Sequence, residues 1–153
     1  MCANRTKYDK LFAAYEKFTK SICEVDDPIV AAICSSWESA KANYGQAVES
    51  GVRKSQIAQG IEQGLREMPM MMSMVEKEKR ERVLAILRVS LDDTFPEFFK
   101  QDATLLAAVI QRSKIRNERE YYLVRHRIDQ LEGEADVPTE LALLYQLVDE
   151  FEA

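Results

Sequence analysis

Apolar side chains recur every three or four residues along most of this chain, and this spacing limits what the chain can fold into. The two clearest stripes consist of Tyr8, Leu11, Phe12, Tyr15, Phe18 and Ile22, then of Ile29, Ile33, Trp37, Ala40, Tyr44 and Val48. A period near 3.6 residues places each set on one face of a helix. Thr6 with Asp9 predicts a capping box before the first helix, and Asp27 with Pro28 predicts the start of the second.

Weaker versions of the same pattern predict further helices over residues 55–67, 73–91, 94–110, 117–131 and 138–151. Ser73, Thr94 and Asn117 are each followed three residues later by glutamate, which predicts a capping box at each helix start. Asp102 is an alternative break and new cap within the fifth helix, and Gly133 is expected to end the sixth. Opposite charges four residues apart, such as Glu76 and Arg80, predict ion pairs along one helix.

The fold class follows from these segments and from the composition. A chain of 153 residues with 46% apolar and 31% charged residues fits one folded, soluble domain. Five glycines and four prolines are too few for a fold built on many hairpins. We therefore predict an all-α, single-domain bundle of six or seven helices. Residues 1–111 would form its body, and residues 112–153 would form an antiparallel helical hairpin at its end.

The beginning of the chain and its cysteines bear on the compartment. Residues 1–7 lead directly into a helical pattern without an apolar stretch, so no secretory signal is expected. The uncharged run at residues 68–75 is too short to span a membrane, as is every other uncharged run of the chain. Cys2, Cys23 and Cys34 lack the spacing of a metal or redox motif, and the helical positions of Cys23 and Cys34 favour buried free thiols. A cytoplasmic protein is expected.

The residues that usually perform catalysis are scarce. His126 is the only histidine, it lies between two arginines, and a surface or hairpin-packing position is the simplest interpretation. Zinc and di-iron sites need several histidine or cysteine ligands at set spacings. The acidic pairs at residues 26–27 and 92–93 are interpreted as helix caps. The sequence therefore predicts no enzyme, no metal and no cofactor.

Five methionines within seven residues are the most unusual local composition. They are Met68, Met70, Met71, Met72 and Met74. The simplest interpretation is a connector whose flexible side chains fill gaps in the core. One alternative is an adaptable surface for an apolar protein partner, and another is a Cu(I) site built from soft sulfur ligands.

The net charge of −5 hides a strong separation near the end of the chain. Residues 112–127 carry a net charge of +4. The basic residues of this segment are Arg112, Lys114, Arg116, Arg119, Arg125 and Arg127. Residues 128–153 carry eight acids and no base. An antiparallel hairpin would let these charges compensate each other. As alternatives, the basic run with Tyr121 and Tyr122 would contact nucleic acid, or the final acids, Asp149, Glu150 and Glu152, would meet a basic protein.

The same segment resembles the helical hairpin of host-inhibition-of-growth antitoxins. The likeness rests on residues 115–121 (IRNEREY), 127–131 (RIDQL), 140–141 (EL) and 144–152 (LYQLVDEFE). In that family the hairpin accompanies a helix-turn-helix DNA-binding domain, and the antitoxin binds a ribonuclease toxin. No helix-turn-helix can be placed convincingly over residues 55–68. The resemblance therefore implies a protein-binding hairpin and leaves DNA binding unsupported.

Three functional hypotheses follow. The first is a non-catalytic cytoplasmic protein that acts through protein contact or self-association, using the final acidic helix and the methionine connector. The second is an antitoxin-like or other regulator that contacts nucleic acid through residues 112–127. The third is a bundle that holds a small apolar ligand among Trp37, Tyr44 and the methionines, which requires a cavity of a few hundred cubic ångströms, roughly 300 or more. No interaction with membranes is expected.

Overall fold

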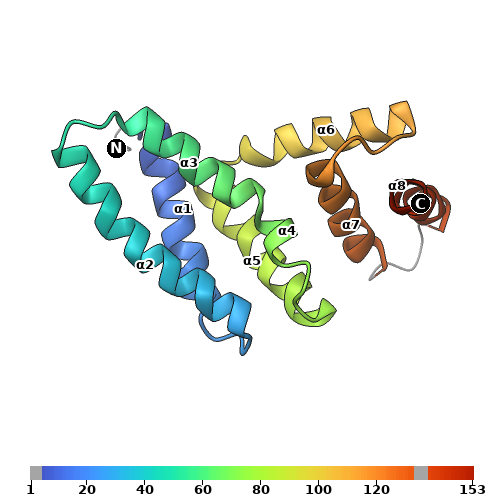
Figure 1. Cartoon of the computed structure of the whole chain (residues 1–153), viewed down its shortest axis with the longest axis horizontal. Helices are drawn as coiled ribbons and strands as arrows, with labels where there is room; N and C mark the ends of the chain where they lie inside the picture. Colours follow the sequence, from blue (N-terminus) through green and yellow to red (C-terminus); the bar gives the residue numbers. More distant parts are fainter. Residues whose placement is uncertain (1–4, 133–137) are drawn as a thin grey trace.

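The computed structural model describes residues 5–132 and 138–153, and all regular secondary structure in these ranges is helical (Figure 1). The predicted all-α class is confirmed. The helices are α1 (Lys7–Ile22), α2 (Pro28–Glu49), α3 (Lys54–Arg66), α4 (Met68–Met71), α5 (Lys77–Thr94), α6 (Phe98–Arg112), α7 (Glu118–Glu132) and α8 (Pro138–Glu152). Within the described ranges, no helix is both long and apolar enough to cross a lipid bilayer.

The first two helices begin where their capping residues predict. The Thr6 side chain accepts a hydrogen bond from the Asp9 backbone N–H, and the Asp9 carboxylate accepts one from the Thr6 N–H. Asp27 accepts hydrogen bonds from the N–H groups of the second and third residues of α2, which begins at Pro28. Gly51, with a φ of +96°, follows the end of α2.

The N-terminal part of the molecule is built around α1, which packs against α2, α3 and α5. Leu11, Phe18 and Ile22 of α1 are fully buried there, together with Leu65, Met68 and Leu91 from the later helices. In α3, the side chains of Ile57, Ala58, Ile61 and Leu65 are buried. Gly60 and Gly64 do not mark a tight helix contact, because a Cβ added at either would meet nothing closer than 3.8 Å.

Two later helices begin differently from the prediction. The α5 helix starts at Lys77 without a side-chain cap, because Ser73 and Val75 close the turn after α4 through backbone hydrogen bonds. Thr94 is the last residue of α5, and its hydroxyl donates to the Ser90 carbonyl. The acidic pair at residues 92–93 therefore lies in the final turn of α5 and caps nothing. Asp102 lies within an unbroken α6.

A second buried cluster forms at the other end of the molecule. Val109 near the end of α6 packs there with residues of α7 and α8, among them Val124, Leu131 and Leu144. Phe98 at the start of α6 belongs to the first cluster instead. The α6 helix thus joins the two clusters, and Figure 1 shows it crossing between them.

The last two helices pack against each other. Asn117 accepts a hydrogen bond from the Glu120 N–H at the start of α7, while the Glu120 carboxylate accepts one from the Arg116 N–H. In α8, Leu144 and Leu147 are buried, whereas Phe151 near its end is 36% exposed. The predicted stop at Gly133 lies outside the described residues.

Candidate functional site

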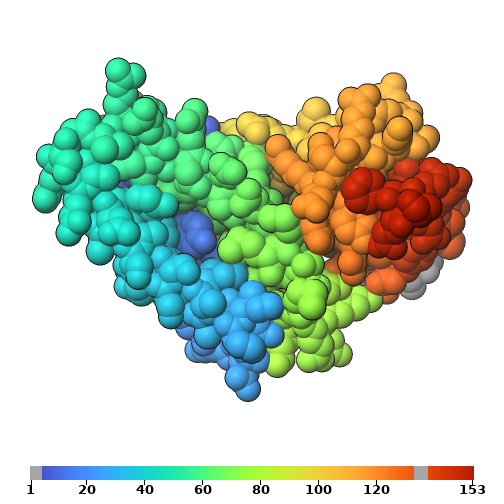
Figure 2. Space-filling model, in the orientation of Figure 1, coloured from blue at the N-terminus to red at the C-terminus, as the bar shows by residue number. Residues whose placement is uncertain are grey.

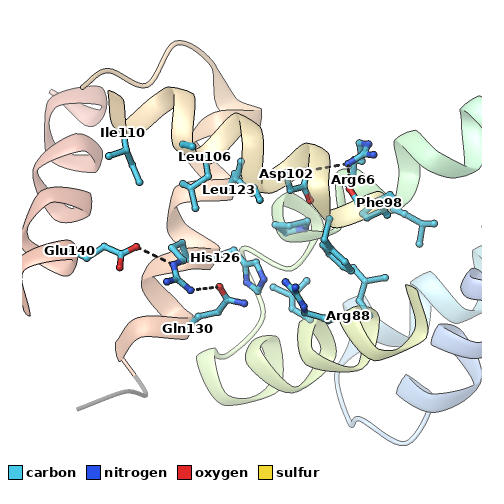
Figure 3. Close-up of a pocket in the computed structure, with 18 residues that line it drawn as sticks. Arg66, Arg88, Phe98, Asp102, Leu106, Ile110, Leu123, His126, Gln130 and Glu140 are labelled. Atoms are coloured by element: carbon cyan, nitrogen blue, oxygen red, sulfur yellow. Dashed lines mark hydrogen bonds and ion pairs between the residues drawn. The ribbon is translucent and has the colours of Figure 1, made fainter. Parts of the chain in front are cut away.

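A cleft of about 340 Å³ lies where α5, α6 and α7 meet (Figure 3). Its walls are mainly apolar and consist of Leu84, Leu87, Phe98, Phe99, Ala103, Leu106, Ala107, Ile110 and Leu123, with Leu65 and Pro69 from α3 and α4. Much of this surface comes from α6, an apolar helix with only Phe98 and Val109 fully covered. The cleft exists because α6 reaches from one buried cluster to the other and leaves the side facing α5 and α7 partly open.

An ion pair between Arg66 and Asp102 borders the cleft. The guanidinium of Arg66 lies 3.1 Å from the Asp102 carboxylate and 2.7 Å from that of Glu62, and it stacks on the Phe98 ring at 4.0 Å. Burial raises the pKa of Asp102, and the neighbouring guanidinium of Arg66 opposes this shift. These contacts occupy Arg66 fully, so it serves to hold α3 against α6.

A second hollow of about 270 Å³ adjoins the same ion pair, with Arg66, Pro69, Asp102 and Leu123 lining both spaces. The rest of its lining comes from α4 and the first turns of α7, including Met70 and Tyr122. The surface is hollowed between these elements in Figure 2. The Arg66–Asp102 pair therefore separates two openings of the molecule.

His126 is the most unusual polar residue of the cleft. Its Nδ1 atom is buried and has no hydrogen-bond partner among the described residues. Burial lowers the pKa of His126, Arg88, Arg80 and Arg127 lower it further, and only Asp129 acts in the opposite direction. The imidazole is therefore neutral at pH 7, with one nitrogen that donates and one that accepts.

Arg88 and Arg127 carry positive charge at the edge of the cleft. Arg88 is half-exposed, stacks on Phe99 at 4.7 Å, and its Nε lies 3.7 Å from Asp92. Arg127 donates to Glu140 of α8 at 3.2 Å. Figure 3 shows His126 and Arg88 on the same side of the apolar space. This arrangement can hold an apolar body and offer a cation and an imidazole to a polar group at its end.

The structure divides the five methionines into two groups. Met68 and Met72 are fully buried in the first cluster, as expected of core-filling residues. Met70 is partly buried, while Met71 is 39% exposed and Met74 is 84% exposed. The connector is therefore not one continuous surface, and the described positions leave Met71 and Met74 as its accessible side chains.

The basic and acidic residues near the end of the chain are mostly engaged, but not as expected. Arg112 pairs with Glu120 at 2.5 Å, Arg119 lies 3.9 Å from Asp102, and Arg125 stacks on Tyr121. Lys114 and Arg116 are exposed. Between α7 and α8, Arg127–Glu140 is one direct ion pair, whereas the acids Asp129 and Glu132 pair with Arg80 and Lys77 of α5. Thus α7 compensates its charge largely through other helices.

The final acids have separate environments. Asp149 and Glu150 are exposed on α8, and Glu152 accepts a hydrogen bond from the Tyr121 hydroxyl. Glu152 therefore fastens the end of α8 to the start of α7. The exposed pair Asp149 and Glu150 is what remains of the predicted acidic surface.

Three sequence interpretations need correction. His126 faces α5 and the cleft and is neither at the surface nor packed in the hairpin. Cys23 is exposed and Cys34 is only partly buried. Trp37 and Tyr44 do not line the cleft. The Trp37 ring is instead covered by the Tyr15 ring, which stacks on it at 4.4 Å, and by the Phe12 ring.

The cleft itself was not visible in the sequence. Its polar residues come from α3, α5, α6, α7 and α8, far apart along the chain, and none forms a motif. The one available signal was the apolar stretch of α6, residues 105–110, which carries more apolar side chains than one buried face needs.

No protein-family model, curated protein or solved structure matches this chain.

Proposed function

We propose that this protein works by binding, without catalysis, and that it holds a small amphipathic molecule in the cleft between α5, α6 and α7. The observation that carries this proposal is the 340 Å³, mainly apolar space that the imidazole of His126 helps to line. Pockets of roughly 300–1,000 Å³ with apolar walls and a few polar groups are typical of small-molecule sites.

The polar residues define the chemistry of the ligand. Arg88 supplies positive charge at the edge of the cleft, and its nearest carboxylate, Asp92, is half-exposed and 3.7 Å away. Asp102 and Glu140 are already engaged with Arg66 and Arg127. A ligand with an apolar body and one anionic or hydrogen-bonding end therefore fits better than a purely apolar or cationic one.

Two fluorescent probes test this chemistry. 1-Anilinonaphthalene-8-sulfonate has an aromatic body and an anionic sulfonate, and N-phenyl-1-naphthylamine is nearly the same molecule without the charge. We expect both probes to bind saturably at one site, the anionic probe more tightly. Arg88→Gln should remove most of this difference, and Arg82→Gln, an exposed arginine of α5 outside the cleft, should not. Absence of saturable binding by either probe contradicts the proposal.

Contact with a protein partner or a second copy is the second candidate function, and exposed Met71 and Met74 favour it. Met74 is 84% exposed and Met71, three residues before it, is 39% exposed, so the two flexible side chains together present an adaptable apolar surface at this turn. Sedimentation equilibrium of the purified chain should show a dimer that Met74→Lys weakens at least tenfold and Ser73→Lys, next to it, does not. A monomer at all concentrations contradicts self-association through this turn.

Nucleic-acid contact and the antitoxin-like role of residues 115–152 stay predictions. Four of the six basic residues lie against acids or an aromatic ring of the same chain, which reduces what they offer to phosphates.

A further inference from the structure

The side chains of Cys23 and Cys34 meet where the end of α1 lies against α2. Their sulfur atoms are 3.0 Å apart, and both thiols point at the carbonyl oxygen of Thr19, at 2.8 Å and 3.5 Å. Cys23 caps the end of α1, and Cys34 lies in the second turn of α2. Eleven positions separate them in the chain.

Core residues hold the two cysteines in this position. Ile22 and Ile33 directly precede them, and both are buried in the first cluster, as is Val25 in the turn between the helices. Asp27 fixes the start of α2 through two backbone hydrogen bonds. The contact between the thiols therefore follows from the packing of α1 on α2.

From this geometry we infer that Cys23 and Cys34 form a reversible oxidation site, in which a peroxide converts the two thiols to a disulfide. A disulfide bond is about 2 Å long, so the sulfurs need to approach by only about 1 Å. The reaction partner is hydrogen peroxide or an organic hydroperoxide, because a thiol pair needs an acceptor for two electrons.

The two thiols have different roles in this reaction. Cys23 is exposed and meets the oxidant first. Its thiolate attacks one peroxide oxygen, so that an S–O bond forms, the O–O bond breaks and hydroxide leaves; the sulfur is oxidised by two electrons to a sulfenic acid. Cys34 is partly buried, and burial together with the hydrogen bond to Cys23 raises the pKa of its thiol to about 12. It is therefore protected from direct oxidation.

The second step joins the sulfurs. The Cys34 sulfur attacks the sulfenic sulfur of Cys23, the S–S bond forms, the S–O bond breaks, and the Cys34 proton leaves with the oxygen as water. In total, two thiols and one hydrogen peroxide give one disulfide and two water molecules. Because the thiols are already in contact, this step is intramolecular and competes well with further oxidation of Cys23.

The product would be a covalent link between α1 and α2 that closes the chain from residue 23 to residue 34. Such a link restricts the unfolded chain, so the oxidised protein should unfold at a temperature several degrees higher than the reduced one, on the order of 5 °C. The cysteine pair lies outside the cleft, so this inference stands independently of the proposed ligand site.

The experiment uses the full chain with Cys2→Ser, which leaves the two relevant cysteines. After treatment with equimolar hydrogen peroxide, free thiols are alkylated and the intact mass is measured. We expect both thiols to disappear together in a monomer that has lost two hydrogen atoms, and dithiothreitol to restore both. A disulfide-linked dimer, or Cys23 oxidised to sulfinic acid beside an alkylated Cys34, overturns the inference.

Two further measurements separate positioning by the fold from ordinary thiol chemistry. With Cys34→Ser, the Cys23 sulfenic acid has no partner, so dimedone should label it at least fivefold more than in the parent. In denaturing urea, where α1 and α2 no longer hold the thiols together, disulfide formation should slow at least tenfold. Equal dimedone labelling, or equal rates in the folded and denatured chains, contradicts the inference.

Discussion

Arg80 of α5 and Asp129 of α7 form a two-point ion pair, with Nε 2.6 Å from Oδ2 and Nη2 3.0 Å from Oδ1. Their side chains are only 13% and 9% exposed. Arg80 also donates to the Val75 carbonyl. The pair lies one turn along α7 from His126, and it fixes α7 against α5 beside the cleft. Its position makes it a main support of the cleft geometry.

Removing one partner of this pair should be costly. Asp129→Ala leaves the Arg80 guanidinium largely buried without its carboxylate, and loss of one partner of a buried pair costs roughly 3–5 kcal/mol. Lys77→Ala is the control, because the Lys77–Glu132 pair links the same two helices at half-exposed positions and is worth less than about 1 kcal/mol. Urea unfolding measures both variants. Equal losses of stability in the two variants would mean that the buried Arg80–Asp129 pair stabilises the fold no more than the half-exposed Lys77–Glu132 pair does.

The pKa of His126 predicts a pH dependence of stability. In the unfolded chain the histidine takes up its proton near its ordinary pKa of about 6.5, whereas in the fold its pKa is lower. Between these two values the unfolded state binds more protons, so stability falls as the pH is lowered below about 6.5. His126→Gln should lose less stability than the parent between pH 7.5 and pH 5.5 in urea unfolding. Identical pH profiles would show that His126 keeps its ordinary pKa.

The division of the methionines predicts unequal costs of truncation. Met72→Ala removes a fully buried side chain and should cost roughly 2–5 kcal/mol. Met74→Ala, two residues away and largely exposed, should stay within about 0.5 kcal/mol. Thermal and urea unfolding of the two variants measure the difference. Similar effects would place both side chains in the same environment, against the structure.

Substitution of two adjacent aspartates distinguishes the effect of helix capping on stability from the effect of charge alone. Asp27→Ala removes the side chain that accepts hydrogen bonds at the start of α2, and it should cost about 1 kcal/mol. Asp26→Ala removes the same charge from an exposed position and should change stability by less than about 0.5 kcal/mol. Urea unfolding again provides the comparison. An equal cost for both would indicate that the pair acts through its charge.

These comparisons also show where the sequence was informative. Thr6 and Asp27 were predicted correctly because a cap depends on residues within one turn. Thr94 follows the same pattern, yet its hydroxyl donates a hydrogen bond to the Ser90 carbonyl inside α5. The next helix begins later, at Phe98, because of Pro96 and the burial of Phe98. Local patterns cannot choose between two uses of the same threonine; packing does.

Most of the candidate site could not be predicted from the sequence. Arg80 is four residues from Glu76 and Arg66 is four residues from Glu62, but their defining partners, Asp129 and Asp102, lie 49 and 36 residues away. Such pairs arise from how α5, α6 and α7 cross. The sequence likewise predicts that His126 lies on a helix. It does not show that His126 lies on the face that contacts α5.

Filling the cleft with a large side chain is the most direct test of the proposed ligand site. Ala107 and Ala108 are neighbouring exposed residues of α6, and only Ala107 lines the cleft. Each is changed to tryptophan, and 1-anilinonaphthalene-8-sulfonate is titrated against the folded variants and the parent. We expect Ala107→Trp to weaken binding at least tenfold and Ala108→Trp to leave it unchanged. Equal binding by both variants would contradict a ligand site in this cleft.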